Sequence, residues 1–285
     1  MAELLKGAPV AEAINKRSSE IVESLKAKGI DTTLAILRVG ENPADISYEK
    51  GAMKRCAGVG VQVKNVLLPI DVDEETVLKT IEDLNNDEKV HGVLIFRPLP
   101  KHISDTKVRA ALCAEKDIDG ITDLSLAGVF TGTATGFAPC TAQACIEILD
   151  HYGIDCKGKR AVVVGRSLVV GKPAAMMLMA KHATVTMCHT RTVNMPETVK
   201  NGEIVIVAAG KAGAVGEGYF SEGQIVVDVG INVNEEGKLC GDADFAAAEG
   251  IVGAITPVPG GVGTVTTSVL VNHVAEAALR QSEGK

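Results

Sequence analysis

The segment VVVGRSLVVGKP, residues 162–173, decides the fold class of this chain. A run of valines ends at Gly165, and a helical pattern begins near Gly171. A strand, a glycine turn and a helix in this order are typical of α/β units that hold a phosphate at the helix N-terminus. The glycine spacing is G-x5-G and not G-x-G-x-x-G, so the segment also fits a tight turn without a ligand.

The same alternation of strand and helix extends in both directions from this segment. Short apolar runs predict strands at 33–40, 61–69, 91–100, 203–210 and 224–232, and helical patterns cover 9–28, 43–59, 71–87 and 140–154. Alternation of this kind predicts an α/β fold with parallel sheets, which are buried on both faces. The uncharged Gly/Thr-rich stretch near 125–145 fits either a domain junction or a loop that lines a cleft.

Composition excludes several classes of partner. The chain has 285 residues, 46% of them hydrophobic, and a formal net charge of -7. A broad nucleic-acid or anionic-membrane surface would need a basic footprint. No apolar run approaches the roughly 20 residues of a membrane helix, and the N-terminus is too polar for a signal peptide. The odd number of cysteines, seven, without C-x-x-C predicts reduced thiols in a cytoplasmic protein without a metal site.

The strand that follows the glycine turn carries information about the cofactor. NAD-specific Rossmann sites usually end this strand with an acidic residue that binds the ribose hydroxyls. No Asp or Glu occurs between Gly165 and Glu197, and the strand ends in His189, Thr190 and Arg191. Arg191 and Arg166 could pair with a 2′-phosphate, which favours NADP over NAD, or could be solvated surface charges.

Several segments together resemble one known family, the methylenetetrahydrofolate dehydrogenase/cyclohydrolases. The matching segments occur in the family's order over nearly the whole chain: NPADISY (42–48), RPLP (97–100), KDIDG (116–120), PCTA (139–142), GRSLVVGKP (165–173), VDVGIN (227–232), GD (241–242) and TPVPGGVG (256–263).

The resemblance implies a two-domain α/β enzyme of one-carbon metabolism. A folate-binding catalytic domain would comprise residues 1–140 and the C-terminal helix 266–285, and would face a Rossmann NAD(P)-binding domain, residues 141–265, across a cleft. The enzyme would be a homodimer. It would oxidise 5,10-methylenetetrahydrofolate to the methenyl cation by hydride transfer to NADP, and many members then hydrolyse the cation to 10-formyltetrahydrofolate.

Site residues follow from the resemblance, motif by motif. Tyr48 would stack on the aminobenzoyl ring of folate and Asp119 would bind the pterin, so these two are the candidate catalytic residues. The other expected substrate contacts are Pro98, Leu99, Gly260, Gly261 and Val262. The expected cofactor contacts are Gly165, Arg166, Ser167, Gly171, Pro173, His189, Thr190, Arg191 and Ile231.

Two departures from the family pattern bear on the hydrolytic step. This chain has Ala52 at the first lysine position of the family pattern Y-x-x-x-K-x-K. It has Phe96 at the glutamine position of the family pattern V-Q-x-P-L-P. Smaller departures are Ala142 and Thr264, where proline is usual. Loss of general acid–base help typically costs roughly 10²–10⁴-fold in rate. We therefore expect weak or absent cyclohydrolase activity.

Neighbouring basic residues are poorly placed to substitute. Residues four apart share a helix face, so position 52 lies on the side of Tyr48, whereas Lys50 and Lys54 point elsewhere. Arg97 should face away from position 96, since successive strand residues alternate.

Three other functions remain open at this stage. The chain could be fully bifunctional, or a catalytically silent folate- or nucleotide-binding paralogue. A generic two-domain amino- or hydroxy-acid dehydrogenase would leave TPVPGGVG unexplained and lacks the expected Lys/Asp pair.

Overall fold

The computed structural model describes residues 1–283, which form two compact units. The six-stranded unit comprises Met1–Glu12 and Thr141–Thr266, and the three-stranded unit comprises Ala13–Cys140 and the chain from Thr267 onward. The expected α/β class, with two units built on parallel sheets, is confirmed. Residues 1–12, which we assigned to the first domain, lie in the six-stranded unit because β1 (Glu3–Leu4) pairs with β11 (Ala254–Ile255).

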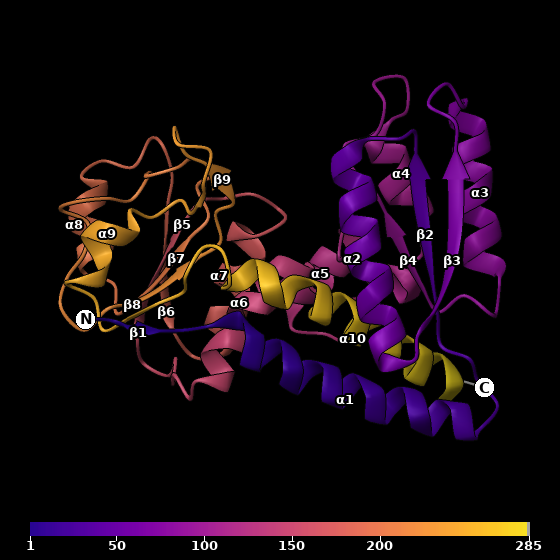
Figure 1. Ribbon diagram of the computed structural model, residues 1–285, viewed down its shortest axis with the longest axis horizontal. Coiled ribbons are helices and arrows are strands. Elements are labelled where there is room, and N and C mark those ends of the chain that lie inside the picture. Colours follow the sequence, from indigo (N-terminus) through magenta and orange to yellow (C-terminus); the bar gives the residue numbers. More distant parts are fainter. Residues whose placement is uncertain (284–285) are drawn as a thin grey trace. The chain divides into compact units, whose positions relative to one another are not determined.

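The six-stranded unit is a doubly wound parallel sheet in the order β1-β11-β8-β7-β5-β6. Its other strands are β5 (Arg160–Val164), β6 (Thr184–Cys188), β7 (Ile204–Val207) and β8 (Ile225–Asp228), and its helices are α6 (Cys140–His151), α7 (Gly171–Ala180), α8 (Met195–Lys200) and α9 (Phe245–Glu249). The helices cover both faces of the sheet (Figure 1).

Strand order creates a crevice in this sheet. From β5 the chain passes to β6 on one side and then crosses to β7 on the other side. Ligands of open α/β sheets bind at the carboxyl ends of the strands where the order reverses in this way. The glycine turn after β5 is therefore at the expected ligand position.

The three-stranded unit has the parallel order β3-β2-β4. Its elements are β2 (Thr33–Val39), β3 (Gln62–Leu68), β4 (Gly92–Ile95), α2 (Pro43–Val59), α3 (Glu74–Asn86), α4 (Asp105–Ala111), the 3-10 helix η1 (Ala114–Lys116) and α5 (Asp123–Thr131). Ala35, Leu37 and Val39 of β2 pack in one core with Val77 and Ile81 of α3. The alternate residues Leu34, Ile36 and Arg38 therefore face the opposite side of the sheet.

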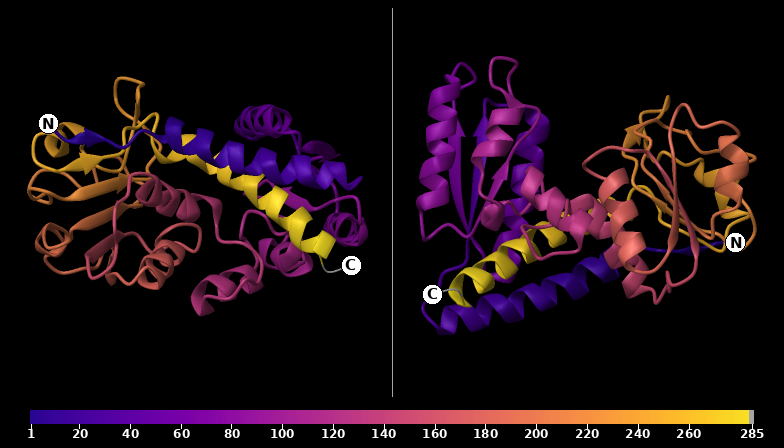
Figure 2. Two further views of the ribbon diagram at one scale, coloured as in Figure 1. Left: turned by 90° about the horizontal axis from the view of Figure 1, so that it is seen from below. Right: turned by 180° about the vertical axis from the view of Figure 1, so that it is seen from behind.

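Two long helices, α1 (Gly7–Ala27) and α10 (Val262–Glu283), lie side by side (Figure 2). Arg17 and Ser18 of α1 both donate hydrogen bonds to the Asn272 side chain of α10. The last two residues of the helix expected at 266–285 lie outside the described residues. Within residues 1–283 no helix is both long and apolar enough to span a bilayer.

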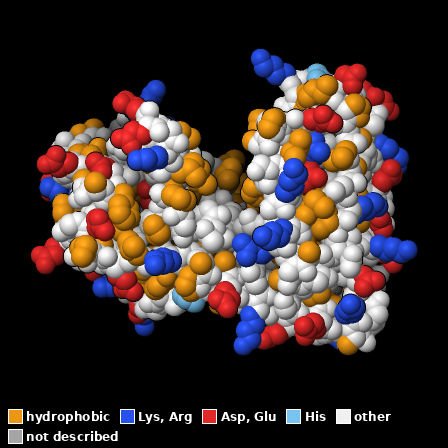
Figure 3. Space-filling model, viewed as in Figure 1, with side chains coloured by type: hydrophobic (Ala, Val, Ile, Leu, Met, Phe, Trp, Pro, Cys, Tyr) orange, Lys and Arg blue, Asp and Glu red, His pale blue; other side chains and the backbone are white. Residues whose placement is uncertain are grey.

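Short elements account for most of the differences from the expected pattern. The Gly/Thr-rich stretch near 125–145 overlaps α5, which ends at Thr131 and is capped by Gly132 with φ 71°. The hairpin of β9 (Asn232–Val233) and β10 (Leu239–Cys240) was also not expected. Basic and acidic side chains are interspersed over the face shown in Figure 3, which agrees with the absence of a basic footprint in the sequence.

Candidate functional site

The glycine turn after β5 packs too tightly for any side chain. Gly165 has φ +129°, and a Cβ atom there would lie 2.1 Å from the carbonyl oxygen of Ala208, which follows β7. A Cβ atom on Gly171 would lie 2.3 Å from the carbonyl oxygen of Gly165. The two glycines thus bring the start of α7 against the crevice between β5 and β7, where a ligand can approach the backbone.

The N-terminus of α7 has the features of a phosphate site. The Ser167 hydroxyl accepts a hydrogen bond from Val170 N–H at 3.1 Å, and the Ser167 carbonyl accepts one from Lys172 N–H at 3.0 Å. The N-cap residue Val170 makes no side-chain cap, and Arg166 and Ser167 are exposed. Pro173, by contrast, is buried in the first turn, so it shapes the helix start.

The turn after β6 presents the second arginine. His189 N–H donates to the Thr192 hydroxyl at 2.9 Å, and Arg191 N–H donates to His189 Nδ1 at 3.1 Å. These bonds use the His189 ring within the turn and leave the side chains of Thr190 and Arg191 exposed. Arg191 and Arg166 are therefore both open to an anionic ligand.

A small pocket brings two groups of expected residues together. Ile231 lines it with Gly260, Gly261 and Val262, and its volume is about 160 Å³. Ile231 is 67% exposed, which is unusual for an isoleucine and leaves its side chain free to contact a ligand.

Asp228 of the segment VDVGIN and Gly241 of the segment GD have packing roles. Asp228 accepts hydrogen bonds from the N–H groups of Gly230, Asp242 and Ala243 at 2.9–3.0 Å. A Cβ atom on Gly241 would lie 1.8 Å from Asp228 Oδ2. Burial raises the pKa of Asp228 to about 6. These residues join the end of β8 to the loop before α9.

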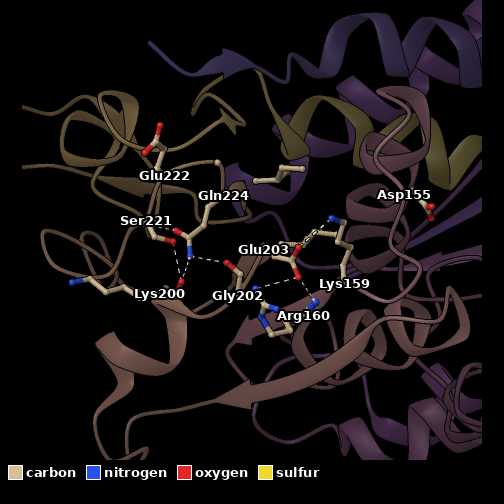
Figure 4. Close-up of a pocket in the computed structure, with 12 residues that line it drawn as sticks. Asp155, Lys159, Arg160, Lys200, Gly202, Glu203, Ser221, Glu222 and Gln224 are labelled. Carbon is tan, nitrogen blue, oxygen red and sulfur yellow. Dashed lines mark hydrogen bonds and ion pairs between the residues drawn. The ribbon is translucent and has the colours of Figure 1, made fainter.

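A second pocket of the six-stranded unit lies at the amino ends of its strands (Figure 4). Its volume is about 270 Å³, and it contains Glu203, which bonds Lys159 and Arg160. The Gln224 amide donates to the carbonyls of Val199 and Gly202, both at 2.8 Å. These contacts tie the starts of β5, β7 and β8 together, and none of the expected site residues lies there.

Tyr48 is the centre of a second site, in the three-stranded unit. Tyr48 is 39% exposed, and its ring packs edge-on against Phe96, with 5.8 Å between the ring centroids. Burial of the hydroxyl, with Cys140 and Asp119 nearby, raises its pKa, and a hydrogen bond with the Thr267 side chain opposes this. Tyr48 and Asp119, the two candidate catalytic residues, therefore lie close to each other.

The charged residues of the KDIDG segment have different roles. Lys116 donates to the carbonyls of Leu84 and Asp87 at the end of α3. Asp117 accepts from the N–H groups of Ile121 and Thr122 and thereby holds the following turn. This leaves Asp119 as the acidic group available to a ligand.

Asp119 has a strongly perturbed environment. Burial raises its pKa to about 6, helped by the charge of Asp117, while a hydrogen bond from Cys140 and the charge of Arg97 act in the opposite direction. Perturbed carboxylates of this kind are common in binding and catalytic sites.

The two departures from the family pattern occupy the same neighbourhood. Ala52, one turn after Tyr48, is fully buried, whereas Lys50 and Lys54 are exposed. Arg97 is held by Asp105 through two hydrogen bonds. Pro98 is exposed and Leu99 is half-buried immediately after this arginine.

Two residues beside Tyr48 and Asp119 were not expected. Cys140 lies in the matched PCTA segment, which could have indicated it, but we gave it no role. Its thiol lies 3.2 Å from the Ile118 carbonyl oxygen. Thr267, from α10, lies in no matched segment, so only the fold brings it to Tyr48.

Comparison with known proteins now identifies the family. Residues 139–282 match the model of the tetrahydrofolate dehydrogenase/cyclohydrolase NAD(P)-binding domain, and residues 5–119 match that of the catalytic domain. The chain belongs to the tetrahydrofolate dehydrogenase/cyclohydrolase family. The resemblance inferred from the motifs is therefore confirmed, and the six-stranded unit is the NAD(P)-binding domain.

Relatives in this family align over almost the whole chain. "Bifunctional protein FolD" of Clostridium botulinum is 47% identical and covers 99% of this chain and 100% of its own length. The FolD structure from Campylobacter jejuni has a TM-score of 0.95 at 37% identity, over 98% of this chain and 99% of its own. The Trypanosoma brucei FolD structure is described as complexed with NADP cofactor and inhibitor. It has a TM-score of 0.91 at 32% identity and covers 99% of this chain and 98% of its own.

Proposed function

We propose that this enzyme oxidises 5,10-methylenetetrahydrofolate to the 5,10-methenyl cation with NADP+ and has weak or absent cyclohydrolase activity. The observation that carries the proposal is the packing of Phe96 against Tyr48, with Ala52 buried one turn further along α2. Tyr48, the proposed folate residue, is present, while the two polar groups of the hydrolytic step are replaced by apolar ones.

The residues after β5 and β6 fit a dinucleotide phosphate. Gly165 and Gly171 let the turn after β5 pack closely against Ala208 and the start of α7, so backbone N–H groups can face a phosphate there. Arg166 and Arg191 offer fork-shaped donors to a 2′-phosphate, and the Trypanosoma brucei relative supports NADP through its described complex. When bound, the nicotinamide accepts a hydride, and the protein's part is to orient it.

The three-stranded unit supplies the folate contacts. Tyr48 offers an open ring for stacking on the aminobenzoyl group, and the Asp119 carboxylate can accept hydrogen bonds from pterin N–H groups. Pro98, Leu99, Gly260, Gly261 and Val262 remain proposed substrate residues. Because the folate nitrogens stabilise the product cation, orientation is the main demand, and it can supply roughly 7–11 kcal/mol.

Hydrolysis of the cation makes a further demand that these residues do not meet. Water must attack the methenyl carbon, and a group near Tyr48 must then take up and return protons. Neither alanine at position 52 nor phenylalanine at position 96 can do this. Lys50 and Lys54 are exposed on other sides of α2, and Arg97 is paired with Asp105.

The test is one reaction mixture followed through two products. Purified enzyme with methylenetetrahydrofolate and NADP+ should accumulate the methenyl cation, and its conversion to 10-formyltetrahydrofolate should equal the rate in buffer alone. Enzyme-dependent hydrolysis comparable with cation formation would instead favour the fully bifunctional alternative, which the names of the curated relatives support. No reduction of NADP+ would favour a catalytically silent binding protein.

The edge of the three-stranded sheet supports a homodimer. Among the described residues, β3 pairs only with β2, so its other side is open. Leu67 is 55% exposed and Ile70 is 62% exposed beside this edge. An open edge strand tends to pair with another chain, and a second copy of this protein can present the same edge.

A further inference from the structure

A buried ion pair links α2 to the sheet beneath it. Arg38 Nε lies 2.7 Å from Glu49 Oε2, and their side chains are 8% and 9% exposed. Arg38 also donates from Nη1 to the carbonyl oxygen of Gly40. Arg38 lies near the carboxyl end of β2, and Glu49 lies next to Tyr48 in the second turn of α2.

Stability alone is a poor explanation for this pair. Two charges removed from water lose their hydration, and well-packed apolar residues of similar volume are often as stable or more stable. What an ion pair with hydrogen bonds adds is direction, since Arg38 is held at both Gly40 and Glu49. It thereby fixes the turn that enters α2 and the rotation of the helix about its axis.

Apart from the contacts of Tyr48 with Phe96 and Thr267, the remaining buried contacts of α2 are apolar and less directional than the ion pair. The other buried residues of α2 are Ala52, Cys56 and Val59, all small. Each residue of a helix advances about 100° around the axis, so a rotation of roughly 20° would move a long side chain by about 2–3 Å. A misplacement of about 1 Å can reduce turnover by about 100-fold. Tyr48, adjacent to Glu49, depends directly on this rotation.

We propose that Arg38 and Glu49 are positioning residues that orient α2 so that the Tyr48 ring meets the folate substrate. The proposal rests on the proposed function, which assigns Tyr48 to the folate ring. It concerns residues that do not themselves touch the substrate.

Two variants at these positions separate positioning from stability. Arg38→Met with Glu49→Leu removes both charges and the directional bond. We expect it to fold with unchanged or higher Tm, to raise KM for methylenetetrahydrofolate at least fivefold, and to leave KM for NADP+ unchanged. Glu49→Gln keeps an acceptor for Arg38 Nε but leaves the arginine unpaired in charge. We expect lower Tm and a folate KM within twofold of the wild type.

A matched control is Lys79→Met with Asp83→Leu, which removes an exposed ion pair from α3 of the same unit and should change neither KM. An unchanged folate KM in the Arg38/Glu49 double variant would overturn the proposal, as would an equal rise in both KM values. Calorimetric binding of tetrahydrofolate is measured on each variant as well. If the wild type does not reduce NADP+, the proposed function fails, and these affinities still decide whether the pair positions the folate site.

Discussion

At the scale of single residues, Asp119 links pH to substrate binding. Its pKa is raised to about 6, chiefly by burial, and its proposed role requires the ionised form. We expect KM for methylenetetrahydrofolate to rise as pH falls below about 6, approaching tenfold per pH unit. Asp119→Asn should have a high KM that does not vary over this range. Initial rates from pH 5 to 8 check this, and a flat wild-type profile would contradict it.

The same residue carries a prediction about stability. Because the pKa of Asp119 is higher in the folded than in the unfolded state, ionisation opposes folding. The protein is therefore more stable while Asp119 is protonated, and this stability is lost as pH rises from about 4 to 6. Asp119→Asn should raise the free energy of unfolding at pH 7 by about 1–3 kcal/mol, measured by urea denaturation. A loss of stability would show that the carboxylate supports the fold.

Arg166 and Arg191 carry the prediction about the cofactor. If both bind a 2′-phosphate, Arg166→Gln with Arg191→Gln removes two charge-assisted pairs, each worth about 1.5–3 kcal/mol. We expect kcat/KM for NADP+ to fall at least 100-fold and kcat/KM for NAD+ to change less than fivefold. Parallel loss with both cofactors would mean that the arginines serve the fold or the shared part of the dinucleotide.

At the scale of elements, α2 and the end of β4 must change together to recover hydrolysis. Ala52 is fully buried and Phe96 packs on Tyr48, so a lysine alone at position 52 would lack both space and a polar partner. We expect Ala52→Lys to be destabilised and inactive as a cyclohydrolase. Ala52→Lys with Phe96→Gln should raise hydrolysis at least tenfold over the buffer rate, followed as decay of the methenyl cation. No gain in a folded double variant would contradict the geometric argument.

The loop that joins β8 to α9 gives a prediction about packing. A Cβ atom on Gly241 would lie 1.8 Å from Asp228 Oδ2, whereas one on Gly250 meets nothing within 4 Å. We expect Gly241→Ala to cost at least about 2 kcal/mol and Gly250→Ala to be neutral or slightly stabilising. Urea denaturation of the two variants provides the comparison, and equal stabilities would contradict it.

Elements with a strong local pattern could be predicted from the sequence. Pro43 and the Gly60 C-cap bound α2 at Pro43–Val59, the range that the sequence indicates. The helix α5 was not predicted, because it is only nine residues long and runs directly into the Gly/Thr-rich stretch. The Thr122 cap and the hydrogen bond of Ser125 with buried Asp117 fix its start. The two-residue β1 has no periodicity, and only its pairing with β11 defines it.

The site could be predicted only as far as its motifs extend. Ala52 and Phe96 are visible as departures from a pattern, but their contacts are not. Tyr48 lies in α2 and Phe96 directly follows β4, so their edge-on packing follows from the fold. Thr267 beside Tyr48 likewise depends on α10 packing in the three-stranded unit.

At the scale of the whole molecule, the open edge of β3 predicts a homodimer that a single charged substitution at this edge should dissociate. Leu67, 55% exposed, would be buried if two copies paired at this edge. Leu67→Lys adds an unpaired charge beside Lys64, whose own charge is paired with Asp87, and charges on edge strands oppose pairing. We expect the wild type to sediment as a dimer and Leu67→Lys as a monomer. Leu124→Lys, at a 61% exposed position of α5 in the same unit, should remain dimeric. A monomeric wild type, or dissociation of both variants alike, would exclude β3 as the interface.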